Sequence, residues 1–347
     1  MGNPGHAALL VLPFRELCEA MPPFGVLLRL YLPLAAGVLA GVLVGQVLAH
    51  VQGGQEPHQR LHQRLPLALG QFLFWVGIPL SIIGFTRRAD LSGPVYLAPA
   101  VAWGAMLLGL LCSRLWIGLR GQTWTRPTQG SFSLASMLGN TGYIGYPVVL
   151  LLPQLGVTVF SWALFYDALG TLLGSYGLGA ILAAEFGGRP PGFSRPAWVS
   201  WPLEVLRNPI ILAFGTGLAL KPLPLPPWLD DLLYAIAWGV VMLSLLLMGL
   251  RIQQLNTWRH LSRAGVAMAI KLLLLPLAVG LALTALGIDG PPRLVMVLQA
   301  GMPSAFSNLV LAEAYDLDRE LSVTCVGLSS VGLLLTLPIW LWGFAPT

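Results

Sequence analysis

The sequence predicts an all-α polytopic membrane protein with ten transmembrane helices, and three observations support this prediction. Of the 347 residues, 56% are hydrophobic and only 10% are charged, and the mean hydropathy is +0.76. Soluble domains carry about 25% charged residues, so this composition excludes a soluble enzyme. The long Leu-, Ala-, Val- and Gly-rich stretches do not alternate as the strands of an outer-membrane barrel do. Several of them reach the length of about 20 residues that a helix needs to cross a bilayer.

Apolar stretches between charged and turn residues predict five spans on each side of a polar connection. The predicted spans are residues 27–49, 66–85, 95–119, 132–152, 157–183, 205–220, 232–250, 264–286, 294–312 and 321–344. The connection over 186–202 is rich in Gly, Pro and Arg and is predicted to be a cytoplasmic linker. It separates a first five-helix repeat over 27–185 from a second over 203–347. Residues 1–26 are expected to form an N-terminal or interfacial segment.

The two halves are predicted to be inverted repeats, because an odd number of spans reverses the orientation of the second half. Trp75 and Ser81 stand at the same spacing as Trp238 and Ser244, and each serine follows a leucine. This similarity favours a 5+5 inverted repeat, and the alternative is a chance match between apolar sequences. Lys and Arg are more frequent in the loops of one side. The positive-inside rule makes that side cytoplasmic and places both termini outside.

The fourth and ninth spans are predicted to be broken helices. The fourth contains GNTGYIGYP at 139–147 and the ninth contains AGMPSAFSN at 300–308. Proline removes a helical hydrogen bond, and glycine permits backbone angles that other residues avoid. Paired interruptions in corresponding spans indicate a transporter binding site, whereas the alternative is a pair of packing kinks. A helix N-terminus created by a break offers free N–H groups and about half a positive charge, which suits a carboxylate. The predicted substrate-binding residues are Asn140, Thr141, Gly142, Pro147, Pro303, Ser304, Ser307 and Asn308.

Five short motifs resemble the auxin efflux carrier family, which includes plant PIN-type carriers and bacterial permeases. They are GNTGYIGYP at 139–147, FYD at 165–167, RNP at 207–209, QAGMP at 299–303 and LTLP at 335–338. The similarity covers most of the chain from about residue 27 and is strongest over 130–182 and 296–342.

The resemblance implies a ten-helix inverted repeat in which helices four and nine cross at their breaks. It implies a scaffold of spans one, two, six and seven, a moving transport unit, elevator-like exchange of organic anions, and a homodimer. Asn140, Thr141 and Pro147 match the first crossover of the family, and Pro303 matches the second. Asn308 stands where some PIN-type sequences have a further proline, and the long hydrophilic central loop of many plant members is absent.

Asp167 and Lys271 are predicted to lie within spans and are the candidate residues for a coupling ion. A charge at the centre of a bilayer costs at least about 2.5 kcal/mol on insertion scales, so Asp167 should face a polar cavity or carry a proton. It is interpreted either as a proton or cation coupling site or as a carboxyl held by neighbouring hydroxyls. Lys271 is expected to extend toward the cytoplasmic interface, with substrate attraction or pairing with Asp167 as the alternatives.

Nothing in the sequence predicts a catalytic site, a metal site or a cofactor. His58 and His62 could share a helical face, but no third metal ligand is evident. The three cysteines have no CxxC spacing, and no HExxH, GxSxG or P-loop motif occurs. The basic residues are scattered rather than gathered on one face, so no nucleic-acid partner is expected.

The sequence therefore predicts a secondary active transporter of small organic carboxylate anions in the plasma (inner) membrane, with the substrate at the crossover. Its expected partners are the anion, the lipid bilayer and a coupling proton or sodium ion. One alternative is a sodium-coupled organic acid symporter resembling the bile-acid carriers, which an acidic and polar cage at the crossover would favour. A channel is the other alternative, because crossed broken helices can also line a pore. An intramembrane hydrolase is not expected, because aspartyl chemistry needs a second buried Asp and Ala180 stands where it would be wanted.

Overall fold

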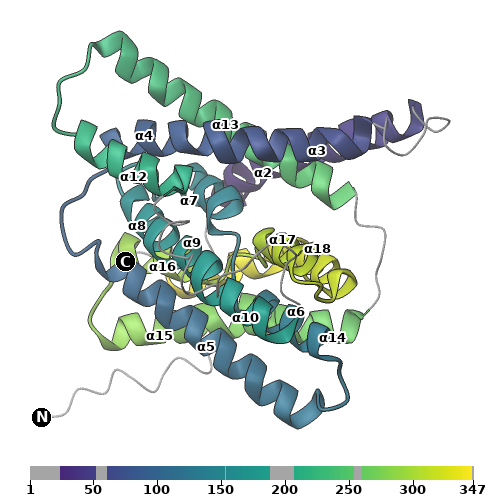
Figure 1. Cartoon of the computed structure of the whole chain (residues 1–347). Coiled ribbons are helices and arrows are strands. Elements are labelled where there is room, and N and C mark those ends of the chain that lie inside the picture. Colours follow the sequence, from purple (N-terminus) through teal and green to yellow (C-terminus); the bar gives the residue numbers. More distant parts are fainter. Residues whose placement is uncertain (1–23, 52–60, 153, 188–206, 254–259, 346–347) are drawn as a thin grey trace, which may run out of the picture.

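Helices make up the regular structure of the described residues, with one isolated β-bridge between Gly139 and Ser304. The computed structural model describes residues 24–51, 61–152, 154–187, 207–253 and 260–345 (Figure 1). The predicted N-terminal segment 1–26 and linker 186–202 lie almost entirely outside these residues. His58 and the side chain of His62 also lie outside the description.

Seven helices of the described part are long and apolar enough to cross a bilayer. They correspond to the first, second, third, fifth, seventh, eighth and tenth predicted spans. Their ranges are Tyr31–Val51, Arg64–Arg88, Leu97–Arg120, Phe160–Phe186, Pro227–Gln253, Leu261–Ala285 and Arg319–Gly343. Three of these helices contain wider π-helical turns, at 73–77, 166–171, 175–179 and 270–274.

Each long helix is continuous or is divided by its π-helical turns. The first half of the chain contains α2 (Phe24–Val51), α3 (Leu61–Phe72), α4 (Ile78–Arg88), α5 (Leu97–Arg120), α8 (Phe160–Phe165), α9 (Leu172–Gly174) and α10 (Ala180–Phe186). The second half contains α13 (Pro227–Gln253), α14 (Leu261–Ala269), α15 (Leu275–Ala285) and α18 (Arg319–Gly343).

The other three predicted spans differ from a single long helix. The fourth comprises α6 (Arg126–Met137), a π-helical turn (Thr141–Gly145) and α7 (Tyr146–Leu151), and the ninth comprises α16 (Gly290–Ala300) and α17 (Ser307–Ala314). The sixth span is α12 (Pro209–Leu220), whose 12 residues are fewer than the predicted range of 205–220 contains. Asn208 precedes this helix and caps it, since its Oδ1 accepts a hydrogen bond from the Ile210 N–H at 2.9 Å.

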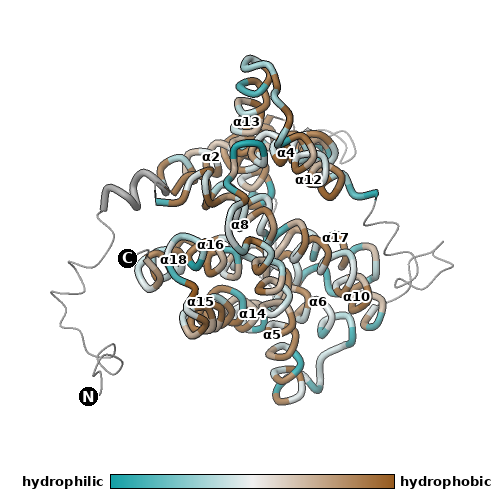
Figure 2. Tube along the Cα trace, turned by 90° about the vertical axis from the view of Figure 1, so that its left-hand side faces the viewer, coloured by the Kyte–Doolittle hydropathy of each residue, from teal (hydrophilic) through white to brown (hydrophobic). Residues whose placement is uncertain are grey.

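The helices form two layers. Figures 1 and 2 show α2, α3, α4, α12 and α13 in one layer, and α5, α6, α10 and α14 to α18 in the other. Most of the trace is coloured hydrophobic in Figure 2. Large apolar side chains are exposed along α2 and α5, including Leu39, Leu43, Leu111 and Leu115. Such faces are suited to lipid, because lipid tails are as apolar as these side chains.

Charged side chains join α4 to the first turns of α13 and to the α12–α13 connection at one end of the first layer. Arg87 pairs with Asp230 at 2.5 Å and Arg88 with Asp231 at 2.6 Å. The Lys221 ammonium donates hydrogen bonds to the carbonyls of Thr86, Arg87 and Ala89, where α4 ends. A cation at this position provides hydrogen bonds for the terminal carbonyls and compensates the partial negative charge at the C-terminus of the helix.

Replacing Gly249 in α13 with alanine is expected to destabilise the protein. A Cβ at this position would overlap the Val38 carbonyl and lie 2.8 Å from the Gly41 Cα of α2, so the two helix backbones would have to separate. Overpacking of this kind costs about 1–3 kcal/mol. Thermal unfolding of the purified variants in detergent measures the effect.

Gly239 provides the control on the same helix, because a Cβ there would meet no heavy atom of the described residues within 4 Å. Gly239→Ala should leave the unfolding temperature unchanged or raise it slightly, since alanine is the better helix former. Equal unfolding temperatures for the two variants would contradict the close α2–α13 contact.

Candidate functional site

The two interrupted spans meet at their interruptions. The Asn140 N–H donates to the Pro303 carbonyl at 2.7 Å, and the Ala305 N–H donates to the Leu138 carbonyl at 3.0 Å. These hydrogen bonds flank the antiparallel bridge between Gly139 and Ser304. Non-helical backbone is tolerated at membrane depth only where its polar groups are satisfied within the protein. Here each unwound segment provides partners for the other.

Small residues and proline explain why the spans unwind at these positions. Pro303 has no N–H to continue the helix from α16, which ends at Ala300. Gly145 follows the first break, and a Cβ there would overlap the Gln299 side-chain amide of α16. A larger residue at this position would therefore have to displace the Gln299 amide.

A cavity of about 420 Å³ lies beside the crossing, between the two layers. Most of its wall is apolar, and its charged lining side chains, among the described residues, are Asp167 and Arg251. The first layer contributes Leu67, Gly70, Gln71, Phe74, Trp75, Ile78, Ile210, Leu247 and Arg251. The second wall comprises Gly139, Asn140, Thr141, Gly142, Tyr143, Asp167, Thr171, Leu172, Ser175, Tyr176, Ala305, Phe306, Ser307, Val310 and Leu311.

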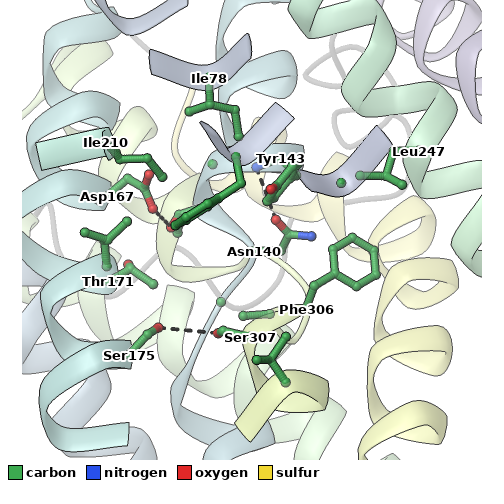
Figure 3. A pocket seen from close by; sticks show the side chains of 18 of the residues that line it. Ile78, Asn140, Tyr143, Asp167, Thr171, Ser175, Ile210, Leu247, Phe306 and Ser307 are labelled. Atoms are coloured by element: carbon green, nitrogen blue, oxygen red, sulfur yellow. Dashed lines mark hydrogen bonds between the residues drawn. The ribbon is translucent and has the colours of Figure 1, made fainter. Parts of the chain in front are cut away.

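Asn140 lies at the start of the second half of the broken fourth span and faces this cavity (Figure 3). Its Oδ1 caps the following helical segment by accepting the Tyr143 N–H at 3.2 Å. Its Nδ2 is buried and has no hydrogen-bond partner among the described residues. An unpaired buried donor is costly, so an acceptor on a bound molecule would be stabilised there.

Asp167 lies on the same wall of the cavity, beside Thr141, and is held there by neutral donors (Figure 3). The Thr141 hydroxyl donates to its Oδ1, and the Tyr146 hydroxyl donates to its Oδ2 at 2.8 Å. The side chain is 7% exposed, and within the described part no Lys, Arg or His pairs with it. These contacts fit the predicted interpretation of a carboxyl held by hydroxyls, and the position on the cavity wall also permits ion coupling.

Hydroxyl groups continue from Asp167 along the cavity wall and form with it a polar strip of Asp167, Thr171, Ser175 and Ser307. Thr171 and Ser175 follow it at intervals of four residues along the fifth span, and all three line the cavity. The Ser307 hydroxyl, at the beginning of α17, lies 3.5 Å from the Ser175 hydroxyl (Figure 3). The polar groups thus converge from the fifth span, which contains π-helical turns, and from the broken ninth span.

The structure places half of the predicted substrate-binding residues on the cavity. Asn140, Thr141, Gly142 and Ser307 line it, whereas Pro147, Pro303, Ser304 and Asn308 do not. The Ser304 hydroxyl donates to the Ala135 carbonyl at 2.7 Å, and its N–H donates to the Ser329 hydroxyl. Pro147 is buried in α7, and Asn308 is fully buried in α17 away from the cavity. Pro303 and Ser304 therefore hold the crossing, and none of the four residues lines the cavity.

Lys271 does not extend toward an interface, so that expectation was wrong. Its side chain is 3% exposed, and its ammonium donates to the Ala300 carbonyl at 2.6 Å. It neither lines the cavity nor pairs with Asp167. The side chain points inward because the end of α16 provides a carbonyl partner inside the protein.

Sequence reasoning missed several lining residues. Thr171 and Ser175 could have been found, because their spacing from Asp167 places all three on one face of a helix. Arg251 has no such signal, because a single basic residue at the end of a span contributes only to the positive-inside count. Its guanidinium donates to the Pro66 carbonyl at 3.4 Å, and its side chain lines the cavity. Among the described residues there is no group of three His, Cys, Asp or Glu side chains that could hold a metal ion.

Comparison with known proteins gives two kinds of match. Residues 197–341 match a family described as membrane transport protein. An uncharacterized transporter of Methanothermobacter thermautotrophicus is 29% identical over 284 residues, which cover 78% of this chain and 87% of the relative. An uncharacterized transporter of Methanocaldococcus jannaschii is 28% identical over 214 residues, covering 61% of this chain and 68% of the relative. The 284-residue match to the Methanothermobacter relative is longer than either half of the chain, so the similarity is not confined to the second half.

Proposed function

Because residues 197–341 match the membrane transport protein family and both relatives are named transporters, we propose that the chain belongs to this family and is a secondary active carrier of small organic carboxylate anions. The observation that carries this proposal is the cavity at the crossing, where Asn140 presents a free amide donor beside the start of a helical segment. A helix N-terminus attracts negative charge through its dipole and its free N–H groups. The substrate carboxylate is placed there, against Asn140 and Thr141.

The apolar part of the wall favours an anion with a carbon body rather than an inorganic one. Phe74, Ile78 and Phe306 face the same space as the polar strip. Pockets for small molecules are mostly apolar, with a few polar groups that set orientation. An inorganic anion would leave this apolar wall without a partner.

The two layers support an elevator-like mechanism built on a ten-helix inverted repeat. The layer of α2, α3, α4, α12 and α13 contains the first two spans of each half, and the other layer contains most of the remaining spans. The cavity lies between them, so movement of one layer along the other would carry the substrate across the membrane. We place both termini outside a plasma membrane and expect a homodimer.

Asp167 is the proposed coupling residue, because it lies on the cavity wall beside Thr141. A sodium symporter of the alternative kind would need an acidic cage at the crossing. In the described part of the chain the cavity has Asp167 as its acidic lining residue, and the charged group at the crossing itself is the cation of Lys271. This arrangement favours the carboxylate carrier over the sodium symporter.

Uptake of radiolabelled carboxylates into proteoliposomes tests the proposal. A panel of aliphatic, dicarboxylic and aromatic acids should contain at least one substrate whose uptake saturates and is accelerated by unlabelled acid inside the vesicles. This counterflow is a property of a carrier that alternates between two sides. Flux that rises linearly with concentration would indicate a channel, and absence of flux for every acid would refute carboxylate transport.

A further inference from the structure

Lys271 contacts both interruptions of the crossing. It lies in the π-helical turn Ile270–Leu274, and its ammonium donates to the Ala300 carbonyl at the end of α16. On the other side it packs against the backbone of Gly139, where a Cβ would lie 2.9 Å from the Lys271 Nζ. Among the described residues no carboxylate lies within ion-pair distance of it. The ammonium therefore lies between the backbone of Ala300 and that of Gly139, where the two spans unwind.

The helix ends at the crossing explain why a cation is stable there without an acidic partner. Both α6 and α16 end at this point, at Met137 and Ala300. A helix C-terminus carries about half a negative charge, so two of them together approach the charge of one monovalent anion. The segments that follow begin near Thr141 and Ser307, which line the cavity. The positive helix ends thus face the cavity, and the negative ends lie beside Lys271.

Half-helix C-termini and unwound carbonyls are the groups that bind the coupling cation in many secondary transporters. We propose that the Lys271 ammonium is a tethered monovalent cation that takes the place of such an ion, so that this crossing neither binds nor requires sodium. The consequence for transport rests on the proposed carrier function, whereas the consequence for ion binding can be measured on the protein alone. Lys271 is a positioning residue, because it holds the crossing and does not touch the cavity.

The protein-only test compares thermal unfolding in sodium chloride and in choline chloride of equal ionic strength. Wild-type protein should unfold at the same temperature in both salts, because its cation is covalently attached. Lys271→Gln should unfold at a lower temperature in choline and recover by about 3 °C or more in sodium, since an ion that binds only the folded state stabilises it. The glutamine amide oxygen would add one ligand for the ion. Lys271→Arg keeps the charge and should show no response to sodium.

Lys221→Gln is the matched control. Lys221 follows α12, and its ammonium also donates to carbonyls at a helix end, but these belong to the end of α4, outside the crossing. Its loss should lower the unfolding temperature equally in both salts. A purely structural role for Lys271 predicts the same pattern for Lys271→Gln, and that result would overturn the proposal.

The response of the wild-type unfolding temperature to sodium tests the tethered-cation proposal even if Lys271→Gln does not fold. A saturable rise of the wild-type unfolding temperature with sodium would show that the crossing accepts a free ion, and would overturn the proposal. An unchanged temperature, with folded and sodium-insensitive Lys271→Arg, would support it. In proteoliposomes, uptake at equal rates in sodium and choline is the corresponding transport result. If no carboxylate is transported, the carrier function fails while the unfolding experiments still test the tethered cation.

Discussion

Asn140→Ala is expected to reduce carboxylate uptake by about 10- to 100-fold, with the protein still inserted and folded. The Asn140 Nδ2 is a buried donor without a partner in the described structure, and it faces the cavity. A hydrogen bond to a charged group contributes about 1.5–3 kcal/mol, and each 1.4 kcal/mol corresponds to about tenfold. Initial uptake rates over a range of substrate concentrations measure the loss and separate its effects on KM and on maximal rate.

Asn140 also caps a helical segment, so the capping role has to be separated from the donor role. Asn140→Asp keeps an oxygen for the Tyr143 N–H but replaces the amide donor with negative charge. It should therefore transport even less than Asn140→Ala while unfolding at a temperature closer to wild type. Asn208→Ala removes a similar cap from α12 at a residue that does not line the cavity. Uptake by Asn208→Ala should remain near wild type, and wild-type uptake by Asn140→Asp would refute the donor role.

The interruptions could be predicted from the sequence because their cause is local. Glycine and proline act on the backbone of their own helix, and Gly139 and Pro303 mark the positions where the described spans unwind. The position of Asp167 on a polar surface followed from the cost of an isolated charge in a membrane. The first argument needs only the local sequence of one span, and the second needs only one residue and the properties of the bilayer.

The direction of long side chains could not be predicted in this way. Lys271 reaches a carbonyl 29 positions along the chain, and Arg251 contacts the carbonyl of Pro66 across the two halves. Tyr146 donates to Asp167 from a neighbouring span, although nothing in its local sequence indicates that partner. Such contacts depend on how the spans pack, and the apolar sequence constrains packing only weakly. The division of the predicted residues into cavity-lining and supporting groups has the same origin.

Asp167→Asn is expected to remove the pH dependence of transport while leaving exchange of the anion intact. Asp167 contacts Thr141, which begins the helical segment where the substrate carboxylate is placed, and a Cβ on Gly142 would lie 3.2 Å from its Oδ2. Two negative charges about 4 Å apart repel each other by about 4 kcal/mol at an effective dielectric constant of about 20. Binding of the anion therefore favours the protonated carboxyl, so wild-type uptake should fall as the pH rises. Asparagine is neutral at every pH and should give a flat profile, measured as initial uptake at internal and external pH values varied together.

The exposed Asp289 supplies the control, because it pairs with Arg293 at 2.5 Å outside the cavity. Asp289→Asn removes one carboxyl from the protein but should retain the wild-type pH profile. A proton gradient should drive accumulation by wild type and by Asp289→Asn, but not by Asp167→Asn, which would only equilibrate the anion. If Asp167→Asn still accumulates substrate against its gradient, the coupling proton is carried by another group. Loss of both exchange and accumulation would instead indicate that the negative charge itself organises the cavity, because asparagine keeps an oxygen that the Thr141 or Tyr146 hydroxyl can reach.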